Sequence, residues 1–397
     1  MILLHFKRLM MNPQGIIHVF NGDLSFHVIR KSEYIIRFSS HPIFLLIYLT
    51  KEDLREKYIA LFTKYGCTDY YITKPVSHRL SLLCNFLLAF KKDQLSPCQN
   101  DLVFHLSKFR TNRILFHGYF FSQLIVALIA IKYFKNVNWI CWGTMLRKNS
   151  ARRLNLRDAL NNWLTETAYK RFNSVICLLK SDQNELESSF SLKHVFLAPY
   201  GCDFNDLYKD NPELVSRRKT NDPPRILVGN SAHVIDDYID FVRGLDGFPA
   251  NVSLTFMMNY GMVSHAEKVE CLKKLLSEKS LTYDFWDKTE PFNVYLEKIA
   301  QFDVYVCPAQ YQSGLGAIYH MLYLGKTVYL KGYNLQWVIQ CGFFSVKDIG
   351  QFLSDVEKGH GFPLDSDLIA RDRDLLTSLT NPAQAIKRHD EIVCRKD

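Results

Sequence analysis

The feature that most limits the fold of this chain is the regular alternation of short apolar segments with longer amphipathic ones. In the first half, β-rich runs fall at 16–20, 44–49, 114–117, 137–141 and 174–178. Helical stretches lie near 52–65, 78–90, 122–135, 155–172 and 181–189. Strands that alternate with helices in this way are typical of parallel α/β folding. The first half is therefore expected to form a parallel sheet covered by helices.

The same alternation restarts after a polar, proline-marked segment at 211–224, which reads NPELVSRRKTNDPP. Strands are predicted there at 225–228, 252–257, 282–285, 304–307 and 327–330, separated by helices. A length of 397 residues suits two domains of roughly 150–200 residues each. We expect an N-terminal domain at 1–215, a linker at 216–224 and a C-terminal domain at 225–397. Both would be α/β, doubly wound and Rossmann-like, facing each other across a cleft lined by loops from the carboxyl ends of strands.

The charge of the chain is unevenly distributed between its halves. Residues 1–220 carry 31 Lys and Arg against 17 Asp and Glu, and 221–397 carry a small acidic excess, which together give the net charge of +9. Such asymmetry indicates an anionic partner for the N-terminal half: nucleic acid, an acidic membrane surface or a phosphorylated substrate. The basic residues of that half include a cluster after the strand at 137–141, namely Arg147, Lys148, Arg152, Arg153 and Arg157. A solvated helix face is the alternative explanation for this cluster.

The cysteines and the apolar segments exclude several classes of protein. The ten cysteines are at least 14 positions apart, so no spacing supports a structural zinc site or a redox pair, and reduced thiols in the cytoplasm are expected. The best membrane-span candidate, 114–134, contains His117, Gln123 and Lys132, and its uninterrupted apolar part is too short to cross a bilayer. The apolar stretch 79–92 has basic ends, which fits a buried helix or a membrane interface. Any membrane contact is therefore expected to be peripheral.

Two loops of the C-terminal half are candidates for binding an oxygen-rich ligand. In the first, a buried strand runs directly into Gly229, Asn230 and Ser231, which can adopt tight turns and offer N–H or side-chain donors. An ordinary strand-to-helix turn is the alternative for this loop.

The second loop, 307–316, leads into the helix at 317–324 and contains Gln312, Ser313, Gly314 and Gly316. Glycines at a helix start expose N–H groups, and the helix dipole can then stabilise a diphosphate without a metal. A glycine-rich turn capped by Ser313 is the alternative, but the position late in the second domain favours phosphate binding.

The N-terminal half places candidate acid–base residues at the ends of strands. His117 ends the strand at 114–117, and Trp142 with Gly143 follows the strand at 137–141. A histidine at the mouth of a cleft can act as a general base or donate to a phosphate, although a structural role is the more common one. After the first strand, Asp23 and His27 are further candidates for the base, and a simple Asn-Gly-Asp turn is the alternative.

Taken together, these loops resemble those of a known family, the TDP-Fuc4NAc:lipid II transferases of enterobacterial common antigen synthesis. The matching elements, in family order across nearly the whole chain, are His18-Val19 with Asp23 and His27, Phe116-His117-Gly118, Trp142-Gly143, ILVGNS at 226–231, and Gln312 with Gly314, Gly316 and Gly325. ILVGNS is the most specific of them.

The resemblance implies a GT-B fold, with the nucleotide-sugar bound mainly by the C-terminal domain and no required metal or other cofactor. It implies transfer of a deoxyamino sugar from a dTDP-sugar to an undecaprenyl-diphosphate-linked saccharide at the cytoplasmic face of the inner membrane. Nucleotide-side residues would be Gly229, Asn230, Ser231, Gln312, Gly314 and Gly316, joined by Ser313 from the loop pattern. His117, Asp23 or His27 would then be the base if the reaction inverts the anomeric centre.

The sequence also departs from the family pattern and leaves alternatives open. Thr144-Met145 stands where the family has Ala-Asp, and Asn259-Tyr-Gly-Met262 is a loose match to its Met-Gly-Tyr-Pro run. An O-antigen or capsule transferase that uses a UDP- or GDP-sugar is therefore an alternative. Rivals from other classes are a basic nucleic-acid-binding protein and a non-catalytic scaffold of the same fold, but no nucleic-acid-binding signature is present.

Overall fold

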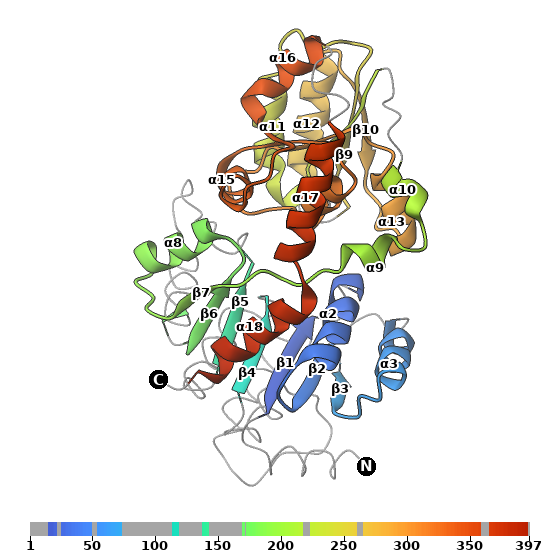
Figure 1. The fold of residues 1–397 in the computed structure, drawn as a ribbon. Coiled ribbons are helices and arrows are strands. Elements are labelled where there is room, and N and C mark those ends of the chain that lie inside the picture. Colours follow the sequence, from blue (N-terminus) through green and yellow to red (C-terminus); the bar gives the residue numbers. More distant parts are fainter. Residues whose placement is uncertain are drawn as a thin grey trace. The chain divides into compact units, whose positions relative to one another are not determined.

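The structure is a computed structural model that describes residues 15–21, 25–49, 54–73, 113–118, 137–142, 169–170, 172–216, 223–259, 265–358 and 365–395. The chain divides into two compact units (Figure 1). The first unit comprises 1–201 together with 382–397, and the second unit comprises 202–381.

The first unit is built on a seven-stranded sheet in the order β3-β2-β1-β4-β5-β6-β7, with every neighbouring pair parallel. Its strands are β1 (Ile16–Asn21), β2 (Ile43–Tyr48), β3 (Tyr70–Thr73), β4 (Arg113–His117), β5 (Val137–Cys141), β6 (Ser174–Cys177) and β7 (Val195–Leu197). The described residues of β4, β5 and β6 are almost all buried, as expected for a parallel sheet covered on both faces.

Four described helices accompany this sheet: α2 (Ser25–Phe38), α3 (Arg55–Lys64), α8 (Lys180–Ser189) and α18 (Pro382–Cys394). Tyr58 and Phe62 of α3 are fully buried in a core cluster with Phe20 of β1. Ile386 of α18 belongs to the same cluster, and α18 also contacts α2, β4 and β6. The last helix of the chain therefore completes the core of the first unit.

The second unit contains a six-stranded parallel sheet in the order β10-β9-β8-β11-β12-β13. Its strands are β8 (Arg225–Val228), β9 (Ser253–Met257), β10 (Thr282–Trp286), β11 (Val304–Cys307), β12 (Thr327–Leu330) and β13 (Val346–Asp348). Its described helices are α9 (Phe204–Tyr208), α10 (Pro212–Ser216), α11 (Ile235–Arg243), α12 (Ala266–Glu278), α13 (Phe292–Ile299), α14 (Leu315–Tyr323), α15 (Gly332–Cys341), α16 (Phe352–Glu357) and α17 (Ser366–Leu379), with short 3₁₀ turns at Ala232–Val234 and Ile349–Gln351.

The predicted α/β class with two doubly wound sheets is confirmed, but the boundaries differ from those expected. The predicted C-terminal domain ran to 397, whereas 382–397 belongs to the first unit because α18 packs there. The predicted N-terminal domain ran to 215, whereas the second unit begins at 202. The reason is aromatic packing, since Phe204 and Tyr208 of α9 stack on Tyr323 of α14.

Predicted elements that fall on described residues match closely in position. The helices predicted at 78–90 and 122–135, and most of the one at 155–172, lie outside the described residues. Among the helices that the structure describes, none is long and apolar enough to cross a membrane.

Candidate functional site

In each sheet, the chain reverses its direction of strand addition at one point. This switch point lies between β1 and β4 in the first unit and between β8 and β11 in the second. Open parallel sheets bind ligands outside the carboxyl ends of the strands at such points. Most of the described site residues predicted from the sequence lie there, so each unit has one candidate region.

The switch point of the second unit brings together the two loops predicted from the sequence. Ser313 Oγ donates to Asn230 Oδ1 at 3.0 Å, which links the loop after β11 to the loop after β8. The fully buried Asn334 of α15 donates to the Ser313 carbonyl at 2.8 Å. Gly314 approaches Asn230 so closely that a Cβ there would lie 3.0 Å from its side-chain atoms, and its φ is +69°. The glycine is thus needed for the contact between the loops.

The hydroxyl of Tyr238, in α11, forms hydrogen bonds with backbone groups of the Gly229–Ser231 loop. Its hydroxyl accepts from the N–H groups of Asn230 (2.9 Å) and Ser231 (3.1 Å) and donates to the Ser231 carbonyl (2.8 Å). The Gly229 N–H donates to Val306 in the neighbouring strand at 2.8 Å. Of the two kinds of donor expected in this loop, N–H groups and side chains, all three N–H groups already have partners inside the unit. The Asn230 side chain is what this loop presents.

The N-terminus of α14 fits its predicted role better. The helix begins after Gly314 in the left-handed conformation, with no side-chain cap on its first turn, and Gly316 in that turn is exposed. Gln312 and Ser313, which precede it, are buried. A helix start of this kind directs free N–H groups and the positive end of the dipole away from the helix, where an anion can bind.

Lys331 adds a positive charge at the same edge of the sheet and was not predicted as a site residue. It follows β12 directly, and β12 pairs with β11. Lys331 Nζ lies 4.0 Å from Asp237 Oδ1 of α11, and both side chains are partly exposed. The position of a lysine immediately after a predicted strand, at its carboxyl end, was the signal that could have identified it.

Two histidines lie at the switch point of the first unit, one on each of its strands. His18 Nδ1 and His117 Nε2 are 3.0 Å apart in a hydrogen bond that joins β1 to β4, and both residues are buried. The Phe20 ring stacks on His117 with centroids 4.0 Å apart. Trp142 Nε1 donates to the Tyr200 hydroxyl at 2.9 Å. Burial holds the pKa of His117 well below its usual value, with the charges of His18, Lys31 and His389 adding to the effect.

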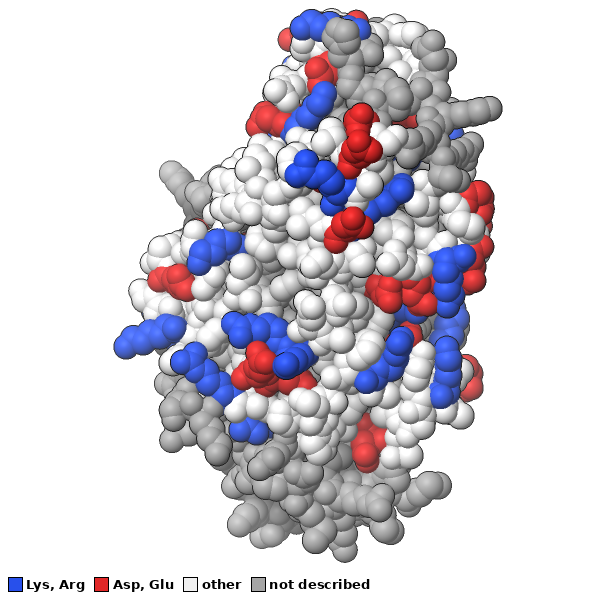
Figure 2. Space-filling view, in the orientation of Figure 1, with Lys and Arg blue, Asp and Glu red and all other residues white. Residues whose placement is uncertain are grey.

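The other predicted bases cannot be placed beside His117. Asp23 lies outside the described residues, as do Gly143 and the basic cluster from Arg147 to Arg157. His27 belongs to α2, but its side chain is not described. On the face shown in Figure 2, described Lys and Arg residues are interspersed with Asp and Glu.

Among the buried ionisable residues of the first unit, His389 and Asp182 were not predicted from the sequence. His389 of α18 is 2% exposed, and the sequence assigned its helix to the other domain. Asp182, in the first turn of α8 just after β6, is 1% exposed, and neither of its oxygens has a hydrogen-bond partner in the described structure. Burial, with a contribution from Glu185, raises the pKa of Asp182 to about 7. Its place after a predicted strand was visible in the sequence, but its burial was not.

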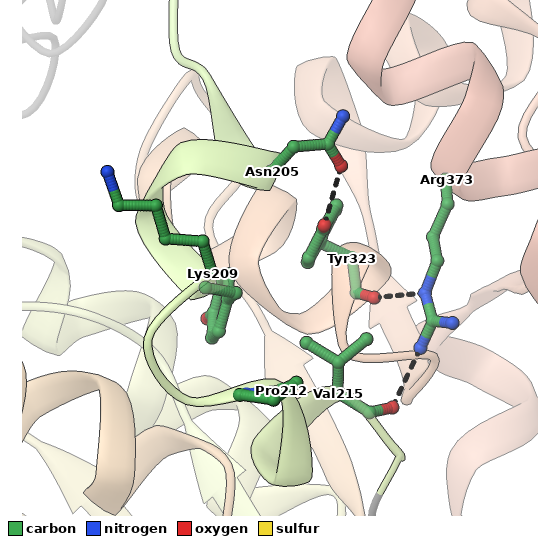
Figure 3. Close-up of a pocket in the computed structure, with 7 residues that line it drawn as sticks. Asn205, Lys209, Pro212, Val215, Tyr323 and Arg373 are labelled. Atoms are coloured by element: carbon green, nitrogen blue, oxygen red, sulfur yellow. Dashed lines mark hydrogen bonds between the residues drawn. The ribbon is translucent and has the colours of Figure 1, made fainter.

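A cavity of about 420 Å³ in the second unit lies away from these loops (Figure 3). It is found near Tyr323, the last residue of α14 and thus at the opposite end of that helix from Gly314. The Tyr323 hydroxyl donates to Asn205 at 2.8 Å, and Arg373 donates to the carbonyls of Tyr323 (2.6 Å) and Val215 (3.0 Å). These bonds tie α9, α10 and α17 to α14, so the polar groups of the cavity have a structural role. In the described parts of the chain, no three His, Cys, Asp or Glu residues are grouped to hold a metal ion.

Comparison with known proteins gives the fold. No protein-family model matches the sequence, and no curated protein matches it. Among solved structures, the chain is similar to HepE (Alr3699) of Anabaena, determined with UDP and glucose, with a TM-score of 0.60 at 12% identity over 95% of this chain and 98% of that one.

Two further structures show the same likeness. A glycosyltransferase from Rickettsia africae has a TM-score of 0.55 at 10% identity over 96% of this chain and 99% of that one. A UDP-forming α,α-trehalose-phosphate synthase from Burkholderia xenovorans has a TM-score of 0.59 at 10% identity over 96% and 98% of the two chains. The chain therefore has the two-domain GT-B fold that these proteins share.

Proposed function

We propose that this protein is a glycosyltransferase that uses a nucleotide-sugar donor. The observation that carries the proposal is the switch point of the second unit, where Asn230, Ser313 and the start of α14 meet within a GT-B fold. The related HepE structure holds UDP and glucose, which supports a nucleotide-sugar for this chain as well.

The donor diphosphate is assigned to the helix start and to Lys331. As the bond between the sugar and the phosphate breaks, negative charge develops on the leaving diphosphate, and oriented donors stabilise it without reorganisation. The first turn of α14 and the Lys331 ammonium are suited to this task. The Gly229–Ser231 loop contributes through the Asn230 side chain, because its backbone N–H groups already donate to the Tyr238 hydroxyl and to the Val306 carbonyl.

The acceptor is assigned to the first unit, with His117 as the first candidate for the base and Asp23 and His27 as alternatives. His117 Nδ1 has no partner in the described structure, and burial holds the pKa of the ring well below its usual value, which favours the neutral ring. A neutral ring nitrogen can take the proton of an acceptor hydroxyl in an inverting reaction.

We further propose the finer specificity that the loop resemblance implies. The donor would be a dTDP-linked deoxyamino sugar, the acceptor an undecaprenyl-diphosphate-linked saccharide, and the enzyme a peripheral protein of the cytoplasmic face of the inner membrane that needs no metal. A UDP- or GDP-sugar for O-antigen or capsule assembly is the alternative donor.

The test begins with a thermal-shift panel of dTDP-, UDP- and GDP-sugars, followed by product analysis with lipid-linked acceptors. A clear preference for dTDP-sugars is expected, and a preference for UDP or GDP would overturn the donor assignment. Binding of oligonucleotides with no response to any nucleotide-sugar would overturn the transferase assignment itself.

A matched pair of variants at Gly316 tests the position of the diphosphate. A glutamate at a helix start favours the helix but repels a diphosphate, so G316E is expected to fold and to bind the donor about tenfold or more weakly. The control G316Q has the same size without the charge and is expected to bind more tightly than G316E. Equal donor affinities of the two variants would place the diphosphate elsewhere.

A further inference from the structure

A buried asparagine of α15 holds the loop from which α14 begins. Asn334, in the first turn of α15, is 0% exposed. Its Nδ2 donates to the Ser313 carbonyl at 2.8 Å, and its Oδ1 accepts from the Ser313 N–H at 3.4 Å. One carboxamide thus pairs with both backbone groups of the residue that precedes Gly314, the N-cap of α14. Only a side chain that both donates and accepts can make this pair of bonds.

The end of β11 supports the same carbonyl more weakly. Cys307 is the last residue of that strand, and its thiol donates to the Ser313 carbonyl at 3.7 Å. Asn334 Nδ2 lies 3.6 Å from the Cys307 sulfur, so the three residues form one buried group. Buried backbone groups lower stability when they lose their partners. The Ser313 backbone is therefore expected to shift when the asparagine is removed.

The start of α15 also carries Lys331, which is the N-cap of that helix, three positions before Asn334. Between these two residues, the Tyr333 N–H donates to the Gln310 carbonyl at 3.0 Å. Gly332 has a φ of +59°, and a Cβ there would lie 2.1 Å from the Gln310 carbonyl oxygen. The start of α15 thus contacts the loop before α14 at two places, once through backbone groups and once through the Asn334 side chain.

The two groups assigned to the donor diphosphate come from different parts of the sheet. The start of α14 follows β11, whereas Lys331 follows β12. Donors stabilise a developing charge best when their positions are fixed before the reaction, and a displacement of about 1 Å can lower turnover about 100-fold. Asn334 is bonded to the loop of one group and belongs to the same helix start as the other. It therefore fixes the distance between them.

We propose that Asn334 is a positioning residue for the donor diphosphate, which holds the start of α14 and Lys331 in one arrangement. The asparagine acts through Ser313, because its carboxamide is buried and already bonded to the backbone of that residue. The inference deepens the proposed function and rests on it for the identity of the ligand. The arrangement of the two helix starts does not depend on that function.

The experiment compares two buried asparagines by replacing each with leucine, which has a similar branched shape and cannot form hydrogen bonds. The test variant is N334L. The matched control is N138L in β5 of the first unit, because Asn138 is also 0% exposed. Its Nδ2 donates to the Ile114 carbonyl at 3.3 Å, and its Oδ1 accepts from Ser174 Oγ at 2.6 Å. Both variants are expected to lose stability, so all comparisons are made per folded molecule.

Binding of dTDP, UDP and GDP is measured by calorimetry at a temperature where both variants are folded. N334L is expected to bind the preferred nucleoside diphosphate at least about tenfold more weakly than the unaltered protein, and N138L within about twofold of it. If N334L does not fold, N334A replaces it, with N138A as its control.

Turnover with the preferred nucleotide-sugar separates positioning from simple binding. For N334L, kcat at saturating donor is expected to fall by at least about tenfold, because the charge on the leaving diphosphate develops only in the transition state. N138L is expected to keep its kcat. Equal diphosphate affinities of N334L and N138L, or equal losses of kcat, would overturn the inference.

A readout without ligand keeps this inference separate from the proposed function. The Ile318 N–H donates to the Gly314 carbonyl at 2.9 Å, in the first turn of α14. Its hydrogen exchange is expected to be faster in N334L than in N138L. An unaltered protein that binds no nucleoside diphosphate would refute the proposed function, and the exchange of Ile318 would then decide alone whether Asn334 holds the helix start. Equal exchange in the two variants would show that it does not.

Discussion

The two switch points have the same topology but opposite chemistry. In the second unit, Asn230 and Ser313 bond to each other, and Tyr238 satisfies the backbone of the neighbouring loop. In the first unit, the bond between His18 and His117 leaves ring nitrogens without partners, and all the polar rings are buried. One switch point has two loops joined by hydrogen bonds, with the buried Tyr305 hydroxyl beside Gly314 left without a partner in the described structure, and the other is a set of titratable groups.

This difference separates two ways of preparing a site. Hydrogen bonds between the loops fix the position of a helix start before any ligand arrives, and this preorganisation suits the binding of a leaving group. Buried groups without partners lower stability and are kept where they have a functional task. The comparison predicts that changes in the second unit act through lost hydrogen bonds, whereas changes in the first unit act through protonation.

The largest expected effect is acid destabilisation of the first unit. The pKa values of His18 and His389 are about 3 in the folded chain and about 6.5 when unfolded. The free energy of unfolding is therefore highest above pH 6.5 and decreases as the pH falls toward 3, because the unfolded chain takes up protons first. Each histidine should cost about 1.4 kcal/mol per pH unit below 6.5, or about 2 kcal/mol at pH 5. Hydrogen exchange of β1 and β4, compared with β8 and β11, measures the effect unit by unit.

The control for this prediction is H389Q, which removes one of the titrating rings. Its first unit should show a shallower loss of protection between pH 7 and pH 5 than the unaltered protein. Identical pH dependence in β1–β4 and β8–β11 would erase the contrast between the switch points.

The second effect comes from Asp182 and has the opposite sign. A carboxyl group whose pKa is raised to about 7 destabilises the fold increasingly as the pH rises from about 4 to 7, because the unfolded chain ionises first. D182N should therefore stabilise the first unit by about 2–4 kcal/mol at pH 8 and have little effect at pH 4. Denaturation at both pH values measures this, with E187Q on the exposed side of α8 as the control. Equal loss of stability at both pH values would show that the carboxylate is needed by the fold.

The fold was predictable from the sequence to a large extent, and the failures have physical causes. The strands predicted in both halves recur in the structure, because buried parallel strands are continuous apolar runs. The edge strands β7 and β13 were missed because they are only partly buried and so lack a continuous apolar run, and the edge strand β3 was missed as well. The domain boundary was misplaced because packing of α18 on a distant sheet leaves no local signal in the sequence.

The candidate site was predictable only where its residues lie directly at the ends of predicted strands. The pairing of the Asn230 and Ser313 loops followed from two strand ends of one sheet, and the strand-end position of His117 was visible as well. The role of Tyr238 was not visible, because a tyrosine seven residues after Ser231 looks like an ordinary core residue of a helix. His389 was missed for the same reason as the domain boundary.

The third prediction tests how far the second unit depends on the hydrogen bonds of the Tyr238 hydroxyl. Y238F removes the hydroxyl that serves two N–H groups and one carbonyl, and unsatisfied buried groups cost about 1–3 kcal/mol each. A loss of about 2 kcal/mol is expected, since water can reach part of the loop. Urea denaturation followed by hydrogen exchange in β8 measures it. Y283F, in β10, is the matched control, and a Y238F protein as stable as Y283F would show that these hydrogen bonds are dispensable.

The smallest expected effect concerns the bond that joins the two loops. A double-mutant cycle of S313A and N230A isolates it, because each change removes one side of the hydrogen bond between Ser313 Oγ and Asn230 Oδ1. We expect a coupling energy of about 1 kcal/mol in stability, the usual net value for one such bond. Donor affinity should show the same coupling if the bond positions the start of α14 for the diphosphate. Coupling in stability without coupling in affinity would mean that the bond holds the loops together while the ligand is positioned by Lys331 and the helix alone.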